Sequence, residues 1–413
     1  MSEKNIGTIM IIGLGLIGSS LARALMAKKA TASVIGVDAS KQSVKLAVEM
    51  GVVDEGTTSL SKFLDVADIV VLATPVKSYQ RILEQIAPHV KDGTIITDVG
   101  SVKLSVIDAA KQTLSAEQRK LFVPAHPIAG TERSGVEAGF ATLFKGKKLI
   151  LCPAEDTDKK AVKRVEQMWK KTGATLEYMD AEAHDKVYAK VSHLVQLLST
   201  AYAATLFSIP KTTLTEIHEN CDANFLSFLR LAGSPSVMWR DVYLVNRTYI
   251  SEATEQFLSQ IRTYSAALRA KNDAQLKSEI SASARRRADY NDVLGRKKEG
   301  KASHYKELKA YGRAMMASLP LLIASGLMAQ VEKKEYPFAS GAGFDGFTRN
   351  LLFSSADLVD SVAEHSTTTL TALEGFVEQL TILLACIRRG ESEQLEKILE
   401  GTRTRYYEFI EKD

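Results

Sequence analysis

The stretch Thr8–Met26, TIMIIGLGLIGSSLARALM, decides the fold of this chain. It opens with an apolar run typical of a buried strand, and its later apolar residues recur at helical spacing. Three glycines, Gly13, Gly15 and Gly18, stand where the strand gives way to the helix. In such a unit the first glycine permits a tight turn, the second lets a pyrophosphate approach the backbone, and the third lets the helix pack on the strand. The stretch therefore predicts a dinucleotide-binding turn.

An acidic residue at the end of the next apolar run indicates which dinucleotide binds. The run Val34–Val37 is followed by Asp38, about 25 residues after Gly13, where a carboxylate would hold the ribose 2′-hydroxyl of NAD. The same carboxylate would repel the 2′-phosphate of NADP. Lys41 lies nearby and leaves NADP open. We predict NAD as the cofactor.

Composition excludes several classes of protein. The chain has 413 residues, of which 45% are hydrophobic and 25% charged, so it is globular and long enough for two or three domains. The 53 basic and 49 acidic residues give a net charge of +4, which favours a small anionic substrate over nucleic acid. The widely spaced cysteines Cys152, Cys221 and Cys386 indicate neither a disulfide framework nor a metal site, and favour a reducing compartment.

The N-terminus and the apolar runs predict neither a signal peptide nor a membrane span. The N-terminus reaches the first strand too soon for a signal peptide. The longest apolar runs fall short of the ~20 residues that cross a bilayer. We therefore expect a cytoplasmic protein without a membrane partner.

Strands and helices alternate over the first 180 residues. Apolar runs at 68–73, 94–97, 122–125, 148–152 and 174–178 predict further strands, and a short helix is expected near 61–66. The alternation predicts a Rossmann-type, doubly wound and mostly parallel sheet over residues 1–180. Ligands of such sheets lie at the carboxyl ends of the strands, where Ser101 and His126 fall. The expected cofactor-binding residues are Gly13, Gly15, Leu16, Ile17, Gly18, Asp38, Thr74, Pro75 and Asp98.

From residue 181 the pattern is helical, and it repeats. A long apolar helix is predicted over 183–206. Asn224–Arg230 aligns with Gly343–Arg349 at a shift of 119 residues (349 − 230). The same shift, without a gap, aligns identical residues: Asp241 with Asp360, Ala253 with Ala372, Phe257 with Phe376, Gln260 with Gln379, Gln275 with Gln394, and Leu276 with Leu395. Upstream, Ser192–Leu198 matches Ala317–Ile323 at a shift of 125 (317 − 192).

The repeat predicts two tandem helical domains, over 181–292 and 304–413, joined by a charged linker at 293–303. Helices this apolar cannot bury their faces alone, so one copy would dimerise through a two-fold interface. Duplication supplies that partner in the same chain. We therefore expect a pseudo-dimer within one chain, as a monomer or a weak homo-oligomer.

Four motifs carry a resemblance to a known family: Asp-Val-Gly-Ser-Val-Lys at 98–103, His-Pro-Ile-Ala-Gly-Thr-Glu at 126–132, Ser-His-Leu at 192–194, and the segment 230–246. Read with the glycine turn, they resemble the prephenate and arogenate dehydrogenases of tyrosine biosynthesis. The resemblance covers about residues 6–290 as one family member, with the second helical copy as an addition.

The resemblance implies an oxidation in which NAD takes a hydride from the substrate ring, which loses carbon dioxide and becomes aromatic. His126 would accept the proton of the ring hydroxyl, and Ser101 would donate a hydrogen bond to that hydroxyl or to His126. Alternatively, Ser101 caps the helix that begins near Lys103, and His126 is a structural residue. The expected substrate-binding residues are Thr131, Glu132, His193, Arg230 and Arg349.

The chain also departs from the family pattern. The family reads Ser-His-Leu-Pro-His where this chain has Val195 and Gln196 at the last two positions. A second family motif, Gly-Gly-Phe-x-Asp-Phe-Thr-Arg, ends in an arginine. Its glycines and its acid survive better in the second helical copy (copy two), over 341–349, than in the first (copy one), over 224–230. Arg230 and Arg349 therefore compete as the carboxylate-binding residue. Prephenate, arogenate, 4-amino-4-deoxyprephenate and a non-catalytic regulator that binds NAD or tyrosine remain open. His184 is expected as a surface residue at a helix start.

Overall fold

The structure, a computed structural model, describes residues 5–131, 133–296, 309–339, 342–353, 362–363 and 365–411. The chain divides into two compact units, Met1–Asp185 and Lys186–Asp413. We call them the N-terminal unit and the helical unit, and describe each by itself.

The N-terminal unit is built on a parallel sheet. Its strands are β1 (Thr8–Ile12), β2 (Ser33–Val37), β3 (Glu55–Thr57), β4 (Ile69–Leu72), β5 (Ile95–Asp98) and β6 (Phe122–Val123). They lie in the order β3-β2-β1-β4-β5-β6, all parallel. The order reverses between β1 and β4, which is the switch point where such sheets bind ligands. The predicted Rossmann-type sheet is confirmed.

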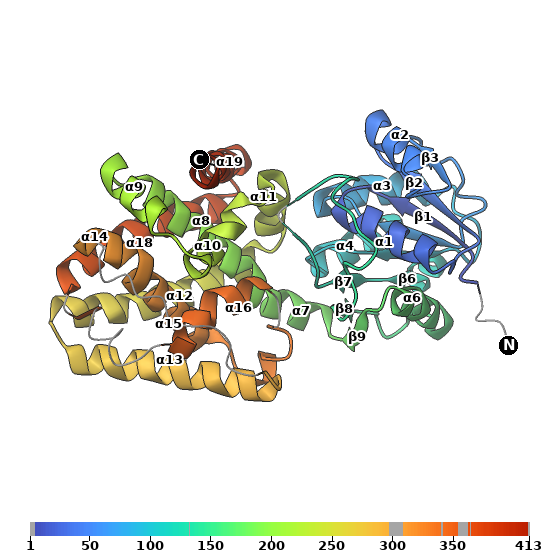
Figure 1. The fold of residues 1–413 in the computed structure, drawn as a ribbon. Helices are drawn as coiled ribbons and strands as arrows, with labels where there is room; N and C mark the ends of the chain where they lie inside the picture. Colours follow the sequence, from blue (N-terminus) through green and yellow to red (C-terminus); the bar gives the residue numbers. More distant parts are fainter. Residues whose placement is uncertain are drawn as a thin grey trace. The chain divides into compact units, whose positions relative to one another are not determined.

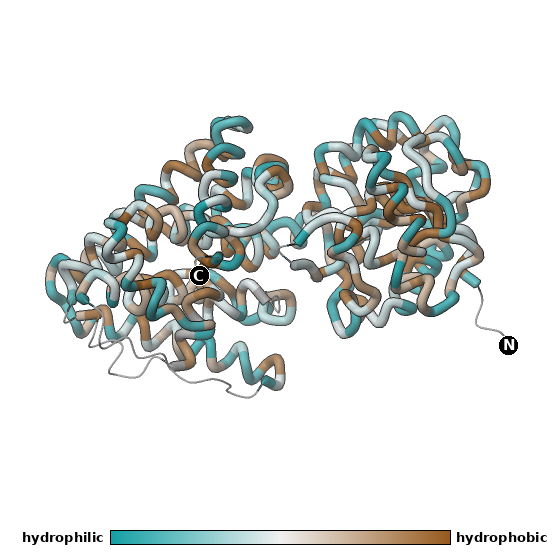
Figure 2. The backbone as a smooth tube through the Cα atoms, turned by 45° about the horizontal axis from the view of Figure 1, so that its top comes forward, coloured by the Kyte–Doolittle hydropathy of each residue, from teal (hydrophilic) through white to brown (hydrophobic). Residues whose placement is uncertain are grey.

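Helices cover both faces of this sheet (Figure 1). They are α1 (Leu16–Ala27), α2 (Lys41–Glu49), η1 (Val76–Ser78), α3 (Tyr79–Ile86), α4 (Leu104–Thr113), α5 (Ala116–Lys120) and α6 (Lys159–Lys171). Successive β1 residues point to opposite faces, so Ile9 and Ile11 pack with α1 and α6, and Met10 and Ile12 pack with α3 and α4. Hydrophobic segments accordingly run through the middle of this unit (Figure 2).

A second, short sheet carries the predicted catalytic histidine. It consists of β7 (Ala125–Pro127), β8 (Lys148–Leu151) and β9 (Thr175–Tyr178), with β7 antiparallel to β8. The expected single strand over 122–125 is thus two strands in two sheets. Pro124 lies at the break, because proline has no N–H to continue a ladder.

One local prediction is wrong. Residues 61–66 form turns and not a helix, and Phe63 has φ of 71°, which a helix does not allow. The long helix expected over 183–206 is confirmed as a continuous helical stretch. It consists of α7 (Ala181–Tyr188), the π-helical segment η2 (Ala189–His193) and α8 (Leu194–Phe207).

The helical unit contains no strand among its described residues. After α8 come α9 (Lys211–Glu219), α10 (Ala223–Leu229), η3 (Arg230–Gly233), α11 (Ser236–Val245), α12 (Arg247–Arg269) and α13 (Asp273–Val293). They are followed by α14 (Ala310–Arg313), η4 (Ala314–Ser318), α15 (Leu319–Gln330), η5 (Lys333–Glu335), α16 (Ala342–Thr348), η6 (Arg349–Phe353), α18 (Ser366–Arg389) and α19 (Ser392–Ile410). The described part of this unit is thus all helical, as predicted.

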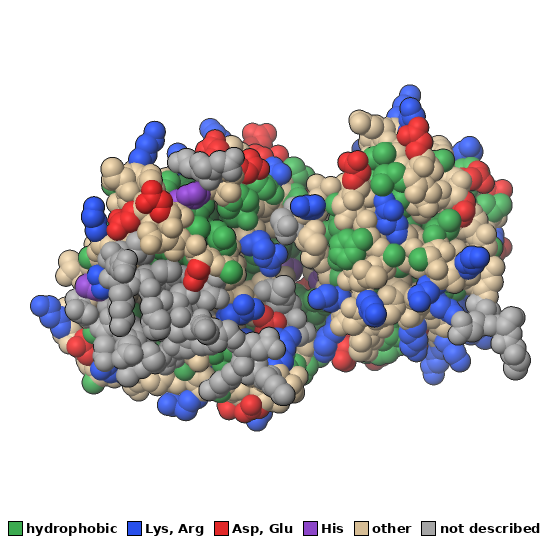
Figure 3. All heavy atoms as spheres, viewed as in Figure 1, with side chains coloured by type: hydrophobic (Ala, Val, Ile, Leu, Met, Phe, Trp, Pro, Cys, Tyr) green, Lys and Arg blue, Asp and Glu red, His purple; other side chains and the backbone are tan. Residues whose placement is uncertain are grey.

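Two stretches, Ala310–Gln330 and Ser366–Arg389, are long and apolar enough to cross a membrane by length and composition. The expectation that every apolar run is too short is therefore wrong. The most apolar window of the first is 83% buried and that of the second 44% buried within the protein, so the first is mostly packed inside the protein. On the surface, basic and acidic side chains are interspersed over the face of each unit seen in Figure 3.

Candidate functional site

The glycine turn between β1 and α1 is closed by backbone contacts. Gly13 has φ of 105°, and a Cβ there would lie 2.5 Å from the Ala73 carbonyl oxygen. A Cβ on Gly18 would lie 1.9 Å from the Gly13 carbonyl oxygen. A Cβ on Gly15 would have no atom within 4 Å. Gly13 and Gly18 are therefore required by packing, whereas Gly15 faces open space.

The first turn of α1 suits a phosphate. Gly15 is the N-cap, without a side-chain cap, and no acidic residue lies in the first turn. The first amides, which include those of Leu16 and Ile17, therefore meet no competing anion from that turn, and the helix dipole favours negative charge there. With the open side of Gly15, this arrangement fits a dinucleotide pyrophosphate.

Asp38 lies at the end of β2, beside the same turn. Its Oδ2 accepts a hydrogen bond from the Leu14 amide at 2.9 Å, and its Oδ1 accepts one from the Ser40 amide at 2.9 Å. The carboxylate thus joins the turn after β1 to the turn after β2. Its position fits the ribose contact expected of it.

Thr74 and Pro75 follow β4 on the same edge of the sheet. The Thr74 hydroxyl lies 2.7 Å from the Ser78 hydroxyl. The buried Tyr79 donates to the Leu72 carbonyl at 2.9 Å, which fixes the end of β4. Both predicted cofactor residues therefore lie beside the switch point, on a turn held by hydrogen bonds.

Asp98, at the end of β5, takes part in a buried ion pair. Its carboxylate is fully buried, and it accepts hydrogen bonds from the amides of Ala125 and Gly100, at 2.9 and 2.8 Å. Lys103, also fully buried, donates from Nζ to Asp98 Oδ2 at 2.5 Å and to the Ala125 carbonyl at 2.6 Å. Burial raises the pKa of the Asp98 carboxyl, and the Lys103 ammonium opposes that rise. The pair ties β5 to β7.

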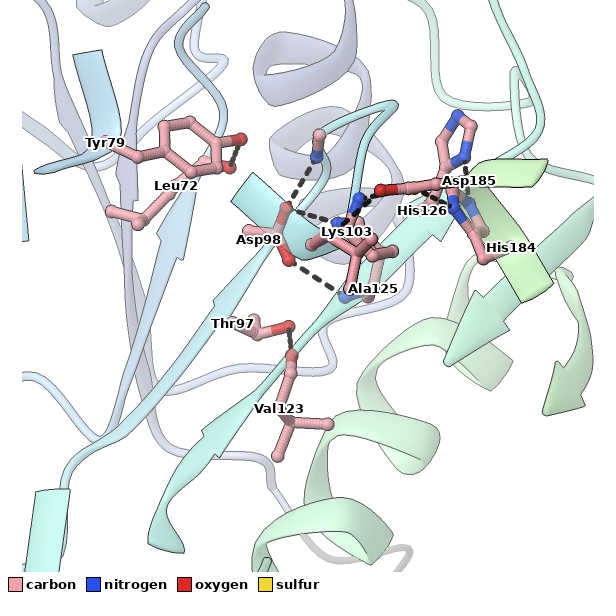
Figure 4. Close-up of polar contacts among 12 residues, drawn as sticks. Leu72, Tyr79, Thr97, Asp98, Lys103, Val123, Ala125, His126, His184 and Asp185 are labelled. Carbon is pink, nitrogen blue, oxygen red and sulfur yellow. Dashed lines mark hydrogen bonds and ion pairs between the residues drawn. The ribbon is translucent and has the colours of Figure 1, made fainter. Parts of the chain in front are cut away.

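His126 lies on β7 in contact with a second histidine (Figure 4). Its Nδ1 is 2.9 Å from Nε2 of His184, and Nδ1 of His184 is 2.8 Å from Oδ1 of Asp185. His184 and Asp185 are 0% and 1% exposed. The prediction that His184 is a surface residue is therefore wrong, because the first turn of α7 is packed against β7.

The hydrogen-bond chain determines the tautomer of His126. Asp185 is held as an acceptor, because its oxygens also receive the amides of Lys103 and Leu104 at 2.7 and 2.9 Å. His184 therefore donates from Nδ1, and its Nε2 must accept when the ring is neutral. His126 then donates from Nδ1 and carries its lone pair on Nε2. This is the form of an imidazole that can accept a proton at Nε2.

The remaining predicted residues of the N-terminal unit are Ser101, Thr131 and Glu132. Ser101 is half-buried, and the start of α4 is capped by Asp185, so the capping alternative for Ser101 is not needed. Thr131 is exposed, and its hydroxyl accepts from the Arg133 amide at 3.2 Å. Glu132 lies outside the described residues.

Two of the predicted residues of the helical unit, His193 and Arg230, lie near its start, and the third, Arg349, lies in its second half. His193 is buried at the end of η2, with Nδ1 3.1 Å from the Asn246 side-chain nitrogen. Arg230 is half-buried at the start of η3, and Arg349 is exposed at the start of η6. Gln196 is buried; it accepts from the Tyr243 hydroxyl and donates to the Leu231 carbonyl at 3.2 Å.

The sequence analysis missed His184 and Asp185. The sequence does show a histidine next to an aspartate at the start of a predicted helix, and these two residue types hydrogen-bond readily. Nothing in the sequence, however, indicates that β7 covers them. No cluster of residues able to hold a metal ion occurs in the described parts of the chain.

Two family models match the chain. One, described as prephenate dehydrogenase, nucleotide-binding domain, matches residues 21–178. The other, described as prephenate dehydrogenase, dimerization domain, matches residues 180–281. The N-terminal unit is thus a nucleotide-binding domain, as its glycine turn predicts.

Individual relatives agree with these matches. A prephenate dehydrogenase of Bacillus subtilis (strain 168) is 34% identical over 62% of this chain and 70% of its own length. A cyclohexadienyl dehydrogenase of Zymomonas mobilis is 33% identical over 63% of this chain and 88% of its own. The crystal structure of prephenate dehydrogenase from Aquifex aeolicus in complex with hydroxyphenyl propionate and NAD+ is similar with a TM-score of 0.60 and 34% identity, covering 66% of this chain and 94% of that one.

Alanine at the two glycines should separate folding from cofactor binding. Gly18→Ala forces α1 away from the Gly13 carbonyl and should lower the free energy of unfolding by about 1–3 kcal/mol. Gly15→Ala has space and an ordinary φ of −71°, so stability should change by less than about 0.5 kcal/mol while dinucleotide affinity falls at least about tenfold. Thermal unfolding and dinucleotide titration measure the two effects. Unchanged affinity in Gly15→Ala would mean that the phosphate lies elsewhere.

Proposed function

We propose, from the premise that this chain belongs to the prephenate dehydrogenase family, that it catalyses the NAD-dependent oxidative decarboxylation of prephenate to 4-hydroxyphenylpyruvate. Its activity is that of a dehydrogenase with NAD as cofactor. The observation that carries the proposal is the hydrogen-bond chain from Asp185 through His184 to His126, because it prepares a base of the kind this reaction needs.

The reaction needs a proton acceptor for the ring hydroxyl. Bound NAD supplies the hydride acceptor. In our proposal, Nε2 of His126 takes the proton of the ring hydroxyl while the hydride leaves the ring carbon that bears this hydroxyl. The ring then loses its carboxylate as carbon dioxide. The positive charge that forms on His126 is stabilised through His184 by the Asp185 carboxylate. Asp185 is kept in place by the two amides of α4 that it caps.

The other predicted residues would bind the substrate. We propose that Ser101 donates a hydrogen bond to the ring hydroxyl. Thr131, Glu132 and His193 would contact other parts of the substrate. An arginine suits a carboxylate because its guanidinium donates two parallel hydrogen bonds.

We assign that arginine to Arg230 and not to Arg349. Arg230 begins η3, which packs on α8 and is joined to it by the bond from Gln196 to Leu231. The buried polar side chains His193 and Gln196 lie at that end of α8, whereas the equivalent residues of the second copy are Ser318 and Leu321.

One observation favours a rival substrate. Gln196, which stands where the family has a histidine, is a neutral amide held by Tyr243 and the Leu231 backbone. If this part of α8 contacts the substrate, a changed side chain is compatible with a changed group on the substrate, such as the amine of 4-amino-4-deoxyprephenate. Arogenate is the other alternative, since an amine replaces the side-chain keto group.

Substrate assays test the proposal directly. Purified protein is offered prephenate, arogenate and 4-amino-4-deoxyprephenate, each with NAD and with NADP, and formation of the reduced cofactor is followed. We expect prephenate with NAD to give the highest kcat/KM, with NADP weaker because Asp38 opposes its 2′-phosphate. Faster turnover of either amine substrate would replace the proposal, and no turnover of any would favour a regulatory protein.

The role of the hydrogen-bond chain is tested at Asp185. His126→Asn removes the base and should lower kcat by about 10²–10⁴-fold with NAD affinity unchanged. Asp185→Asn can donate to His184 and reverse both tautomers, so kcat should fall by at least about 10²-fold with little change in KM. Steady-state kinetics across pH provide the measurement, and the acid limb of the kcat profile should move.

Asp180→Asn is the matched control. Asp180 accepts from the amides of Glu182 and Ala183 at the same helix start, but it lies outside the chain of hydrogen bonds. We expect wild-type kcat and an unchanged pH profile. If both variants lose activity equally, the effect belongs to the helix and not to the tautomer of His126.

The two equivalent arginines serve as each other's control. Arg230→Ala should raise KM for the substrate at least about tenfold, while kcat and NAD affinity change less. Arg349→Ala should leave KM within about twofold. Steady-state kinetics of both variants separate the assignments. The reverse result would assign the carboxylate to copy two.

A further inference from the structure

The helical unit repeats one order of elements. The π-helical segments Ala189–His193 and Ala314–Ser318 each lead into an apolar helix, α8 or α15, at an offset of 125 residues (314 − 189). The starts of α10 and α16, of α12 and α18, and of α13 and α19 are all offset by 119 (342 − 223, 366 − 247, 392 − 273). Five-residue π-helical segments are rare in proteins. Their recurrence at the offset found by sequence alignment indicates two copies of one domain.

Equivalent residues of the two halves contact each other. The rings of Phe228 and Phe347 stack with centroids 4.3 Å apart, and those of Phe257 and Phe376 meet edge to face at 6.2 Å. Both pairs are offset by 119 residues (347 − 228, 376 − 257). A residue that contacts its own equivalent lies beside a two-fold axis. These four buried rings therefore mark a pseudo-two-fold axis inside the unit.

The ion pairs between the halves are reciprocal. Arg269 contacts Glu374 at 2.6 Å, and Arg388 contacts Glu255. The two arginines are offset by 119 (388 − 269), and so are the two glutamates (374 − 255). Packing is reciprocal as well, because α8 packs on α18 and α15 packs on α12. The same set of residues is thus used by both halves, each set contacting its equivalent in the other half. This is the arrangement of an isologous dimer interface.

Two buried polar pairs of the first copy are not both kept in the second. His193 pairs with Asn246, and Gln196 with Tyr243. By the same offsets, their equivalents in the second half are Ser318, His365, Leu321 and Val362. Leu321 and Val362 are apolar, so the second half has kept the packed rings of the interface but has lost the polar pair that Gln196 and Tyr243 form in the first half.

We propose that residues 310–411 are a second copy of the first helical domain, and that they take the place of a partner subunit. The chain is then a complete pseudo-dimer with one reaction site, and it needs no second chain. The single site rests on the proposed function, whereas the built-in partner rests on the contacts above. A failure of the assays would therefore leave the built-in partner untouched.

Mass and unfolding test the proposal without any assay of activity. The full chain should sediment at 45.2 kDa over a roughly 100-fold range of concentration, and Tm should stay constant over that range because unfolding is unimolecular. A mass of twice this value, with a Tm that rises with concentration, would overturn the proposal. A protease site inserted between residues 297 and 308 provides a second measurement. The cut fragments should stay together at the same mass, and their separation in native buffer would also overturn it.

The reciprocal ion pairs provide matched variants. Glu374→Arg opposes Arg269 and should lower Tm by at most about 3 °C, equally at every concentration and without a change in mass. Arg269→Glu added to it should restore Tm. Glu255→Arg, its equivalent at the other pair, should behave in the same way. If the decrease in Tm of either variant depends on protein concentration, the ion pairs join two chains and the proposal is wrong.

Discussion

The buried ion pair between Lys103 and Asp98 is the interaction on which the reaction site depends. Both side chains are fully buried, and together they contact the amide and the carbonyl of Ala125. A buried charge without its partner costs about 3–5 kcal/mol, so neither residue can be removed alone. His126 is the next residue in the chain. The ion pair therefore fixes the backbone that carries the imidazole, across the gap between two separate sheets.

Asp185 couples the stability of a helix to the orientation of the base. Its carboxylate accepts the first amides of α4, where the helix dipole favours negative charge. One of the same oxygens holds His184 and, through it, the tautomer of His126. Its two oxygens already accept the amides of Lys103 and Leu104, so the carboxylate faces His184 as a hydrogen-bond acceptor. The residue that stabilises the fold thus also keeps the lone pair of His126 on Nε2.

Local sequence was enough for the parts of the site that depend on backbone shape. The glycine turn needs a positive φ at Gly13 and a missing Cβ at Gly18, and only glycine satisfies both. Long-range packing decided the rest. His184 was misread as a surface residue, and the ion pair of Asp98 was not foreseen, because their partners, His126 and Lys103, come from other elements. Pro124 divided one expected strand into two for a reason visible in the sequence, but the second sheet depends on β8 and β9, far along the chain.

A tethered partner changes what the helical interface has to achieve. Two free chains at micromolar concentration associate only if their interface binds more tightly than micromolar, whereas a short flexible linker gives an effective concentration near millimolar. An interface within one chain can therefore be about 10³-fold weaker and still remain closed. The two halves of such an interface also need not stay identical in sequence, because each half always meets the same, different half. The second half can then lose polar groups such as those replaced by Leu321 and Val362 while Phe347 and Phe376 stay buried against their equivalents.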